Sequence, residues 1–387
     1  MWSAPVDRCF EISNDRRAEQ HATGPEALRG SEGNSRKSAP GGSCPGPLQN
    51  RRPQRSGKRQ LYQRYTVQFI GFVIERGGMQ VLDIAGSPHV ALQVDHGEAA
   101  SPLAYSVGGI CVGVFAAPGL QLELDPELFP FHVSLKNPDV RIEVDWTSEI
   151  VAPSGPLIFE SGGLWSLYEE YGGYTFHFST PRLGATPYKT AWFDHEFRFG
   201  HVSMLRRFYD VSQPVNALEY PLDELVTIHR LALGEGVEVH ALGVVDEFNR
   251  GHLFIGHSGA GKSTSARLWQ KRPGARVLSD DRIILRCENG RTRMYGTPWH
   301  GDAGLALAES ANLFGIYVLA HGTRNKLTRL PAGRAAAELL ARSFVPHHSA
   351  EGLEFTLQIL DRITREIPCS RFEFVPDQSA LEVICRA

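Results

Sequence analysis

The apolar positions change their period part-way along the chain. Between about residues 61 and 233, short runs rich in Val, Ile, Phe, Tyr and Trp are separated by Gly, Pro and Asn, which is typical of strands joined by turns. In VRIEVDW at 140–146, apolar and charged residues alternate with a period of two, so they lie on opposite faces of a strand. We expect an antiparallel, β-rich module here that serves structure or recognition.

From about residue 234 to residue 387, strand patterns alternate with helical ones. Apolar runs predict strands at 252–256, 275–281, 282–286 and 313–319, and helical spacing predicts helices at 262–270, 335–343 and 353–366. Asn289-Gly290 lies between two strand patterns and predicts a two-residue hairpin. This part is expected to be an α/β domain with a mixed sheet.

Residues 1 to 60 differ from both parts in composition. They are rich in Gly, Pro, Ser, Gln and Arg, carry few large apolar side chains, and include the basic run RRPQRSGKR at 51–59. Such a segment cannot bury enough apolar surface to order itself. We expect a disordered basic tail and assign it no function.

The overall composition limits the partners. The 387 residues are 42% apolar and carry a net charge of -3, which favours a globular protein and predicts neither nucleic acid nor an anionic membrane as an obligatory partner. No stretch approaches the roughly 18 to 20 uninterrupted apolar residues of a membrane span, and the N-terminus lacks the pattern of a secretory signal. The six cysteines lie far apart, which fits a reducing compartment. We expect a cytoplasmic protein.

The segment GHSGAGKST at 256–264 fits the pattern GxxxxGK[ST] and lies between an apolar strand and a helix. In that context, small residues let successive backbone N–H groups surround a β-phosphate, and Lys262 reaches the β- and γ-phosphate oxygens. The hydroxyl of Ser263 is then a ligand for Mg²⁺. The nucleotide-binding residues predicted from this loop are Gly256, His257, Ser258, Gly259, Ala260, Gly261, Lys262, Ser263 and Thr264.

Two carboxylates, Asp280 and Asp281, follow the next short apolar stretch. Phosphoryl transfer to a hydroxyl needs an acidic group near Mg²⁺ and a base that accepts the proton of the acceptor. Because neighbouring strand residues point in opposite directions, we expect the two aspartates to have unequal roles. We place Asp281 with Ser263 at the metal, while the sequence leaves open which aspartate is the base.

Other classes of P-loop protein are disfavoured by missing patterns. Asn325-Lys326-Leu327 is followed by Thr328, so the guanine-specifying NKxD is absent. The chain also has no dinucleotide fingerprint, no nucleophile elbow and no HExxH. A GTPase switch is therefore not expected.

The order HALG at 240–243, GHSGAGKS at 256–263 and LSDDR at 278–282 resembles the catalytic domain of the bacterial HPr serine kinases. It is also similar to HPr-kinase-like proteins of peptide-modification gene clusters, which share a β-rich N-terminal part and a GTPWHGD-like stretch. The resemblance implies a phosphoenolpyruvate-carboxykinase-like fold for about residues 220 to 387. It also implies that His240 lies near the active site and that the aspartate pair provides base and metal contacts.

The chain departs from the HPr kinases at Thr264, where the family commonly has Glu, and it lacks their C-terminal signature. We therefore expect an acceptor other than HPr. In the stretch YGTPWHGD at 295–302, His300 is a candidate for contact with that acceptor, although a packed turn explains the same letters. The expected catalytic residues are thus Asp280, Asp281, His240 and His300.

The sequence as a whole predicts an ATP- and Mg²⁺-dependent kinase that phosphorylates a serine-type hydroxyl of a peptide, a protein or a small molecule. Two alternatives stay open. One is a non-catalytic nucleotide-binding sensor or scaffold, which needs the P-loop but not both aspartates. The other is a carboxykinase or a small-molecule kinase of the same fold. The sequence does not distinguish ATP from another triphosphate, and it leaves an oligomer open.

Overall fold

A computed structural model describes residues 73–75, 78–80 and 101–386. The predicted tail at 1–60 lies outside the described residues, as do most residues of the module before residue 101. Strands β1 (Val73–Glu75) and β2 (Gly78–Gln80) form an antiparallel pair in a unit of their own. Residues 95–387 form a second unit, which contains every feature discussed below.

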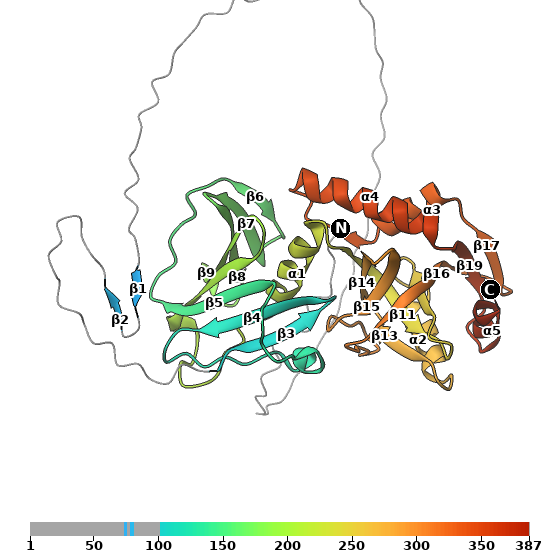
Figure 1. The fold of residues 1–387 in the computed structure, drawn as a ribbon, viewed down its shortest axis with the longest axis horizontal. Coiled ribbons are helices and arrows are strands. Elements are labelled where there is room, and N and C mark those ends of the chain that lie inside the picture. The colour runs from blue at the N-terminus through green and yellow to red at the C-terminus, as the bar shows by residue number, and fades with distance from the viewer. Residues whose placement is uncertain (1–72, 76–77, 81–100, 387) are drawn as a thin grey trace, which may run out of the picture. The chain divides into compact units, whose positions relative to one another are not determined.

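The first large sheet has eight strands in the order β3-β4-β5-β10-β9-β8-β7-β6 (Figure 1). Its strands are β3 (Leu103–Val107), β4 (Ile110–Ala116), β5 (Val140–Thr147), β6 (Leu157–Glu160), β7 (Trp165–Glu170), β8 (Gly173–Thr180), β9 (Gly184–Asp194) and β10 (Phe199–Leu205). The β-rich composition of this region is as predicted. In β5 the apolar Val140, Ile142 and Val144 are buried, which confirms the alternation.

The expectation of an antiparallel module was wrong at two pairs of strands. β5 runs parallel to both β4 and β10, so the sheet is mixed. The alternating pattern fixes which side chains of a strand are buried, but it carries no information about the direction of the neighbouring strand.

Helix α1 (Leu222–Ala232) follows this sheet and was not predicted. Its Leu222, Leu225 and Val226 pack into the core of the eight-stranded sheet. The same core includes Ile284 and Trp299 from the second sheet region. The two sheets therefore share apolar packing through α1, which Figure 1 shows between them.

The second sheet has nine strands and carries the P-loop. They are β11 (Val237–Val245), β12 (Gly251–Ile255), β13 (Arg276–Ser279), β14 (Arg282–Glu288), β15 (Arg291–Gly296), β16 (Ser310–His321), β17 (Lys326–Arg329), β18 (Ser343–Phe344) and β19 (Cys369–Phe374). The strand order is β12-β11-β14-β15-β16-β19-β17. Because β12 also pairs with β16, the five strands from β12 to β16 in this order form a closed ring. The sheet contains parallel and antiparallel pairs, as expected for this region.

Four helices accompany the second sheet. They are α2 (Lys262–Gln270), α3 (Ala332–Leu340), α4 (Ala350–Glu366) and α5 (Ser379–Cys385); short 3₁₀ turns, η1 (Pro126–Phe131) and η2 (Arg206–Phe208), lie in the first sheet region. The hairpin at Asn289-Gly290 is confirmed: both residues have positive φ, and β14 and β15 pair across them. Among the described helices, none combines the length and apolar character needed to span a membrane.

Candidate functional site

The P-loop connects the end of β12 to the start of α2. Gly259 and Gly261 have φ of 79° and 104°, in the left-handed region that a side chain disfavours. Gly261 is also the N-cap of α2, and no side chain caps the helix there. The first N–H groups of α2 are therefore free of side-chain partners, as an anion-binding helix end requires.

Lys262 lies in the first turn of α2 and is folded back over the loop. Its Nζ donates to the carbonyl of Gly256 at 3.2 Å, and the side chain is buried. Burial, together with the positive charges of Arg342 and Arg282, lowers the pKa of Lys262 to about 8. Nearby positive charges and burial destabilise the protonated form of Lys262, and a bound polyanion stabilises that form again. The surroundings of Lys262 therefore favour binding of a phosphate chain.

The other predicted residues of the loop occupy distinct environments. His257 and Ser258 are exposed, and the His257 ring bonds the Ser258 carbonyl at 2.7 Å. Ala260 is buried, whereas Ser263 and Thr264 are half-buried in the first turn of α2. The hydroxyl of Ser263 is thus at the helix end where the phosphates are expected.

Strand β11 lies between the P-loop and the aspartate pair. Its Ala241 pairs with Ile255, the last residue of β12, on one side. On the other side, the N–H of Ala241 donates to the carbonyl of Asp281 at 3.0 Å. Two strand spacings of about 4.8 Å therefore separate the backbones of Ile255 and Asp281, roughly 10 Å in all. The register brings the predicted aspartates to the edge of the sheet that carries the P-loop.

Asp281 is bound by a histidine and an arginine. His240 Nε2 contacts one carboxylate oxygen at 2.8 Å, and Arg282 Nη1 bonds the other. Burial and the cations Lys262, Arg282 and Arg342 lower the pKa of His240 to about 4. The structure brings together His240 and Asp281.

Asp280 is enclosed by the loop that follows β15. Its side chain is 2% exposed, and its carboxylate accepts backbone N–H groups from Gly301 at 3.0 Å, Ala303 at 2.9 Å and Leu305 at 3.3 Å. A Cβ on Gly301 would meet Asp280 Oδ2 at 2.8 Å, so the packing is close. Asp280 holds the loop in place, and its oxygens are already occupied.

The loop held by Asp280 also reaches the first sheet region. His300 Nε2 contacts Glu127 of η1 at 3.0 Å, and its Nδ1 lies 3.0 Å from the Gly301 carbonyl. Trp299 is buried and donates from Nε1 to Asp223 of α1 at 2.7 Å. The structure thus directs His300 toward Glu127, on the eight-stranded sheet side of the loop, while the aspartate pair is held by other partners.

Arg342 is a further cation at the site. Its carbonyl accepts the N–H of His240 at 2.7 Å, because β18 follows it directly and pairs with β11. Its Nη1 bonds Glu338 at 2.9 Å, while its buried Nε has no hydrogen-bond partner among the described residues. The charge of Arg342 lowers the pKa of both Lys262 and His240, so it acts at the centre of the site.

Sequence reasoning missed two buried glutamates behind Arg282. Glu224 of α1 bonds Arg282 Nε at 2.9 Å, and Glu238 of β11 lies 3.5 Å from the same atom. Both are fully buried, and burial beside Glu224 raises the pKa of Glu238. One signal was present: Glu238 and His240 are two residues apart on one strand, so they share a face. Glu224 gave no such signal, because it lies in a helix that was not predicted.

No family model matches the chain, and no curated protein matches it. Among solved structures, the chain is similar to the HPr(Ser) kinase/phosphatase from Coxiella burnetii, with 18% identity over 33% of this chain and 92% of that one. The TM-score is 0.19, and a likeness at that score does not establish a shared fold.

Proposed function

We propose that the protein is an ATP- and Mg²⁺-dependent kinase of the HPr serine kinase-like type, which transfers a γ-phosphoryl group to a hydroxyl. One observation carries the proposal: the P-loop with Lys262 follows β12 on one side of β11, and Asp281 lies on the other side, where it bonds His240 of β11. In our proposal residues 234–387 form the nucleotide domain, with a phosphoenolpyruvate-carboxykinase-like fold. The β-rich module before it serves recognition.

The P-loop provides the phosphate site in this proposal. The uncapped N-terminus of α2 and the ammonium group of Lys262 bind the β- and γ-phosphates, and Arg342 adds charge on the side of His240. The Ser263 hydroxyl offers the hard oxygen donor that Mg²⁺ prefers, whereas both oxygens of Asp281 already bond His240 and Arg282. Magnesium would supply neutralisation of the phosphate charge. Most of the rate would come from positioning and electrostatics.

Asp281 is the base that we propose. We do not assign this role to Asp280, because its carboxylate is buried and accepts three backbone N–H groups. The side chain of Asp281 is 26% exposed, and His240 and Arg282 fix its orientation. As the acceptor oxygen bonds the γ-phosphorus, the acceptor proton passes to the Asp281 carboxylate. The bond from the γ-phosphorus to the β–γ bridging oxygen breaks, and ADP leaves with its electron pair.

The acceptor is expected between the aspartate edge and the module. The loop at 297–305 connects Asp280 to Asp223 and Glu127, so a molecule at Asp281 lies near residues of both sheets. We propose that the acceptor is a serine-type hydroxyl of a peptide, a protein or a small molecule. His300 lies on this loop and is our candidate for contact with the acceptor.

The test is transfer of label from γ-labelled ATP with Mg²⁺ to three separate pools: peptides encoded beside the gene, proteins of the native extract, and small metabolites. Wild type and Lys262→Ala are compared by mass spectrometry. We expect one labelled hydroxyl compound with the wild type and none with the variant. Equal labelling by both proteins would exclude the P-loop from the reaction and refute the proposal.

A nucleotide sensor is the second candidate, and the loop at 297–305 is the observation that favours it. The loop joins the aspartate edge to the shared core through Trp299, which gives a route from a bound nucleotide to the module. ATP binding without transfer to any of the three pools would favour the sensor.

A further inference from the structure

The guanidinium group of Arg282 is held on three sides. Nε donates to Glu224 of α1 at 2.9 Å, Nη1 donates to Asp281, and the central carbon lies 4.2 Å from the centroid of the Phe344 ring. The backbone of Arg282 pairs with His240 across β11 and β14. Both partners of the Asp281 carboxylate therefore come from adjacent positions in the sheet, and one of them is tied to α1.

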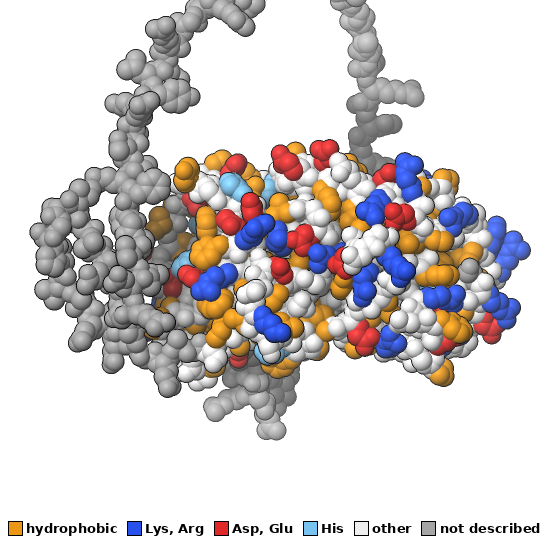
Figure 2. All heavy atoms as spheres, in the orientation of Figure 1, with side chains coloured by type: hydrophobic (Ala, Val, Ile, Leu, Met, Phe, Trp, Pro, Cys, Tyr) orange, Lys and Arg blue, Asp and Glu red, His pale blue; other side chains and the backbone are white. Residues whose placement is uncertain are grey.

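Glu224 is the acceptor for Arg282 Nε. The nearest oxygen of Glu238 is 3.5 Å from that atom, and neither oxygen of Glu238 has a hydrogen-bond partner among the described residues. Acidic and basic side chains are interspersed over the face in Figure 2, where solvent screens such pairs. Glu224 is 0% exposed, so water cannot replace its bond to Arg282.

The residue before Glu224 is linked to the other aspartate. Asp223 accepts from Trp299 Nε1 at 2.7 Å, and the loop that carries Trp299 donates three N–H groups to Asp280. Neighbouring carboxylates of α1 thus hold the partners of both neighbouring aspartates. Because apolar residues of α1 pack in the core of the eight-stranded sheet, both links begin in the β-rich module.

We propose that Glu224 is a positioning residue for phosphoryl transfer: it holds Arg282, and through Arg282 the Asp281 carboxylate, in the orientation that receives the acceptor proton. The inference rests on the proposed function, because it takes Asp281 as the base. It extends that function in one respect. The base is not fully oriented by residues 234–387, since the module supplies Glu224 from α1.

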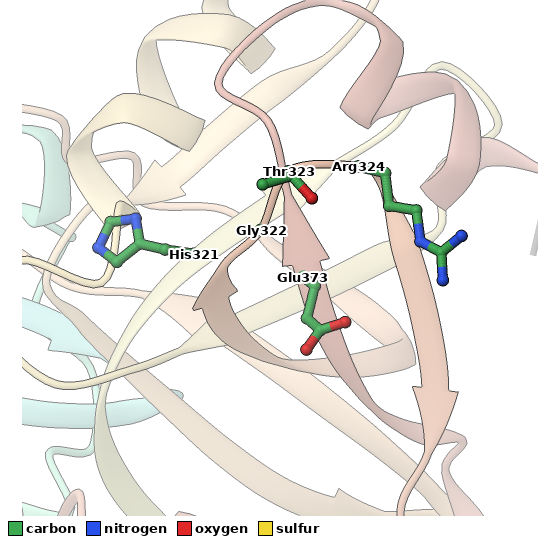
Figure 3. A pocket seen from close by; sticks show the side chains of 5 residues that line it. All are labelled: His321, Gly322, Thr323, Arg324 and Glu373. Carbon is green, nitrogen blue, oxygen red and sulfur yellow. The ribbon is translucent and has the colours of Figure 1, made fainter.

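The far side of the P-loop is built without α1. His321 Nε2 of β16 lies 3.1 Å from the carbonyl of Gly259, beside a hollow of about 460 Å³ (Figure 3). The hollow is lined by His321, Gly322, Thr323, Arg324 and Glu373. Among the described residues, no hydrogen bond or ion pair joins α1 to this lining or to the P-loop. A change at Glu224 should therefore act on kcat and leave the KM for ATP.

Two substitutions separate the reach of Glu224 from its charge. Glu224→Asp keeps a carboxylate but shortens the side chain by a methylene group, so the carboxylate withdraws from Arg282 Nε. Glu224→Gln removes the charge but keeps an acceptor oxygen at the same reach. A misplacement of about 1 Å can cost about 100-fold in rate. We expect kcat to fall about 10- to 100-fold in Glu224→Asp and less than about threefold in Glu224→Gln.

The assay follows consumption of γ-labelled ATP by the full chain, with Mg²⁺ and the three acceptor pools, over a range of ATP concentrations. The KM for ATP should stay within about twofold of the wild type in both variants. Urea unfolding of the same preparations shows that each variant is folded. A residue with a purely structural role would lower the urea midpoint without lowering the kcat of the folded protein.

Glu235→Asp is the matched control. Glu235 follows α1 and accepts from Arg286 Nη2 at 2.9 Å, and Arg286 lies on β14 with Arg282. The bond is of the same kind and reaches the same strand, but Arg286 bonds none of the residues proposed for catalysis, within the part of the chain that the structure describes. We expect Glu235→Asp to keep the wild-type kcat.

A folded Glu224→Asp protein with the wild-type kcat would overturn the inference and leave the proposed function standing. Equal losses of kcat in Glu224→Asp and Glu224→Gln would also overturn it, because reach would then not matter. If Glu224→Asp does not fold, Glu224→Gln decides alone: a loss of about tenfold or more in that folded variant contradicts positioning by the hydrogen bond. A wild type that consumes no ATP would refute the proposed function, and the inference with it.

Discussion

Asp280 and Asp281 are neighbours, and the structure predicts opposite consequences for the same substitution at each. Asp280→Asn removes a buried charge that accepts three backbone N–H groups. Asp281→Asn changes a partly exposed carboxylate that bonds His240 and Arg282. We expect the first to reduce stability and the second to reduce phosphoryl transfer.

The expected loss of stability in Asp280→Asn follows from the hydrogen bonds of Asp280. The asparagine side chain has one acceptor oxygen, and it keeps the most bonds when that oxygen takes the place of Oδ1, which accepts from Gly301 and Leu305. The amide nitrogen then faces the N–H of Ala303, which loses its acceptor. Hydrogen bonds to charged groups contribute about 1.5–3 kcal/mol each. With one bond lost and two weakened, the free energy of unfolding should fall by about 2–4 kcal/mol.

The expected loss of stability in Asp281→Asn is smaller because solvent reaches the side chain. Its side chain is 26% exposed, and Arg282 keeps its bond to Glu224. We expect a loss of about 1 kcal/mol or less in the free energy of unfolding. Transfer of the phosphoryl group should fall by about 10²-fold or more, since general-base catalysis typically contributes that much.

Urea unfolding of the two variants measures the difference directly, with the transition midpoint as the readout at constant slope. The same preparations are assayed for consumption of γ-labelled ATP. An Asp280→Asn protein that unfolds at the wild-type urea concentration would refute the role of Asp280 as the anchor of the loop.

Three further predictions follow from buried groups and from the P-loop. Burial raises the pKa of Asp223 to about 7, so between about pH 4 and 7 the folded state keeps a proton that the unfolded chain has released. The free energy of unfolding should therefore fall by about 1.4 kcal/mol per pH unit across that range. Urea unfolding should show a flatter pH profile for Asp223→Asn than for the wild type. In Gly261→Ala the new Cβ would meet the Phe374 ring, and the residue would need a positive φ; in Gly259→Ala the residue would need a positive φ, but the space around its Cβ is open. The affinity for tripolyphosphate, measured by calorimetry, should therefore fall much further in Gly261→Ala than in Gly259→Ala. Burial raises the pKa of Glu238, so Glu238→Gln, which mimics the protonated acid, should change the urea-derived unfolding free energy by less than about 1 kcal/mol; a loss of about 3 kcal/mol or more would show that the carboxylate is charged.

Several strands and helices of the second sheet region could be predicted from sequence, because their apolar runs and turn residues are local signals, whereas β18, β19 and α5 were not predicted. The hairpin at Asn289-Gly290 and the strand before the P-loop are examples. Helix α1 was not predicted, since it lies after a long β-rich stretch and nearly all its residues are buried, including Asp223 and Glu224.

The residues of the candidate site also divide into those that the sequence reveals and those that only the structure reveals. The P-loop, the aspartates and His240 could be found from residue types at fixed spacing. The unequal environments of Asp280 and Asp281 were expected, but the enclosure of Asp280 depends on N–H groups of a loop more than 20 residues away. Every residue except proline has a backbone N–H group, so the sequence does not show which of these groups bond Asp280. Arg282 and Glu224 could not be paired from sequence for a similar reason, because their contact joins a strand to a helix 58 residues away.

The central claim, that this chain consumes ATP through Asp281, is tested by measuring ATP affinity and γ-phosphate transfer on the same samples of wild type and Asp281→Asn. Transfer is followed to water and to each acceptor pool with Mg²⁺ present. The account predicts that both proteins bind ATP with similar affinity and that only the wild type consumes it. Equal consumption by the two proteins at equal occupancy would contradict the account.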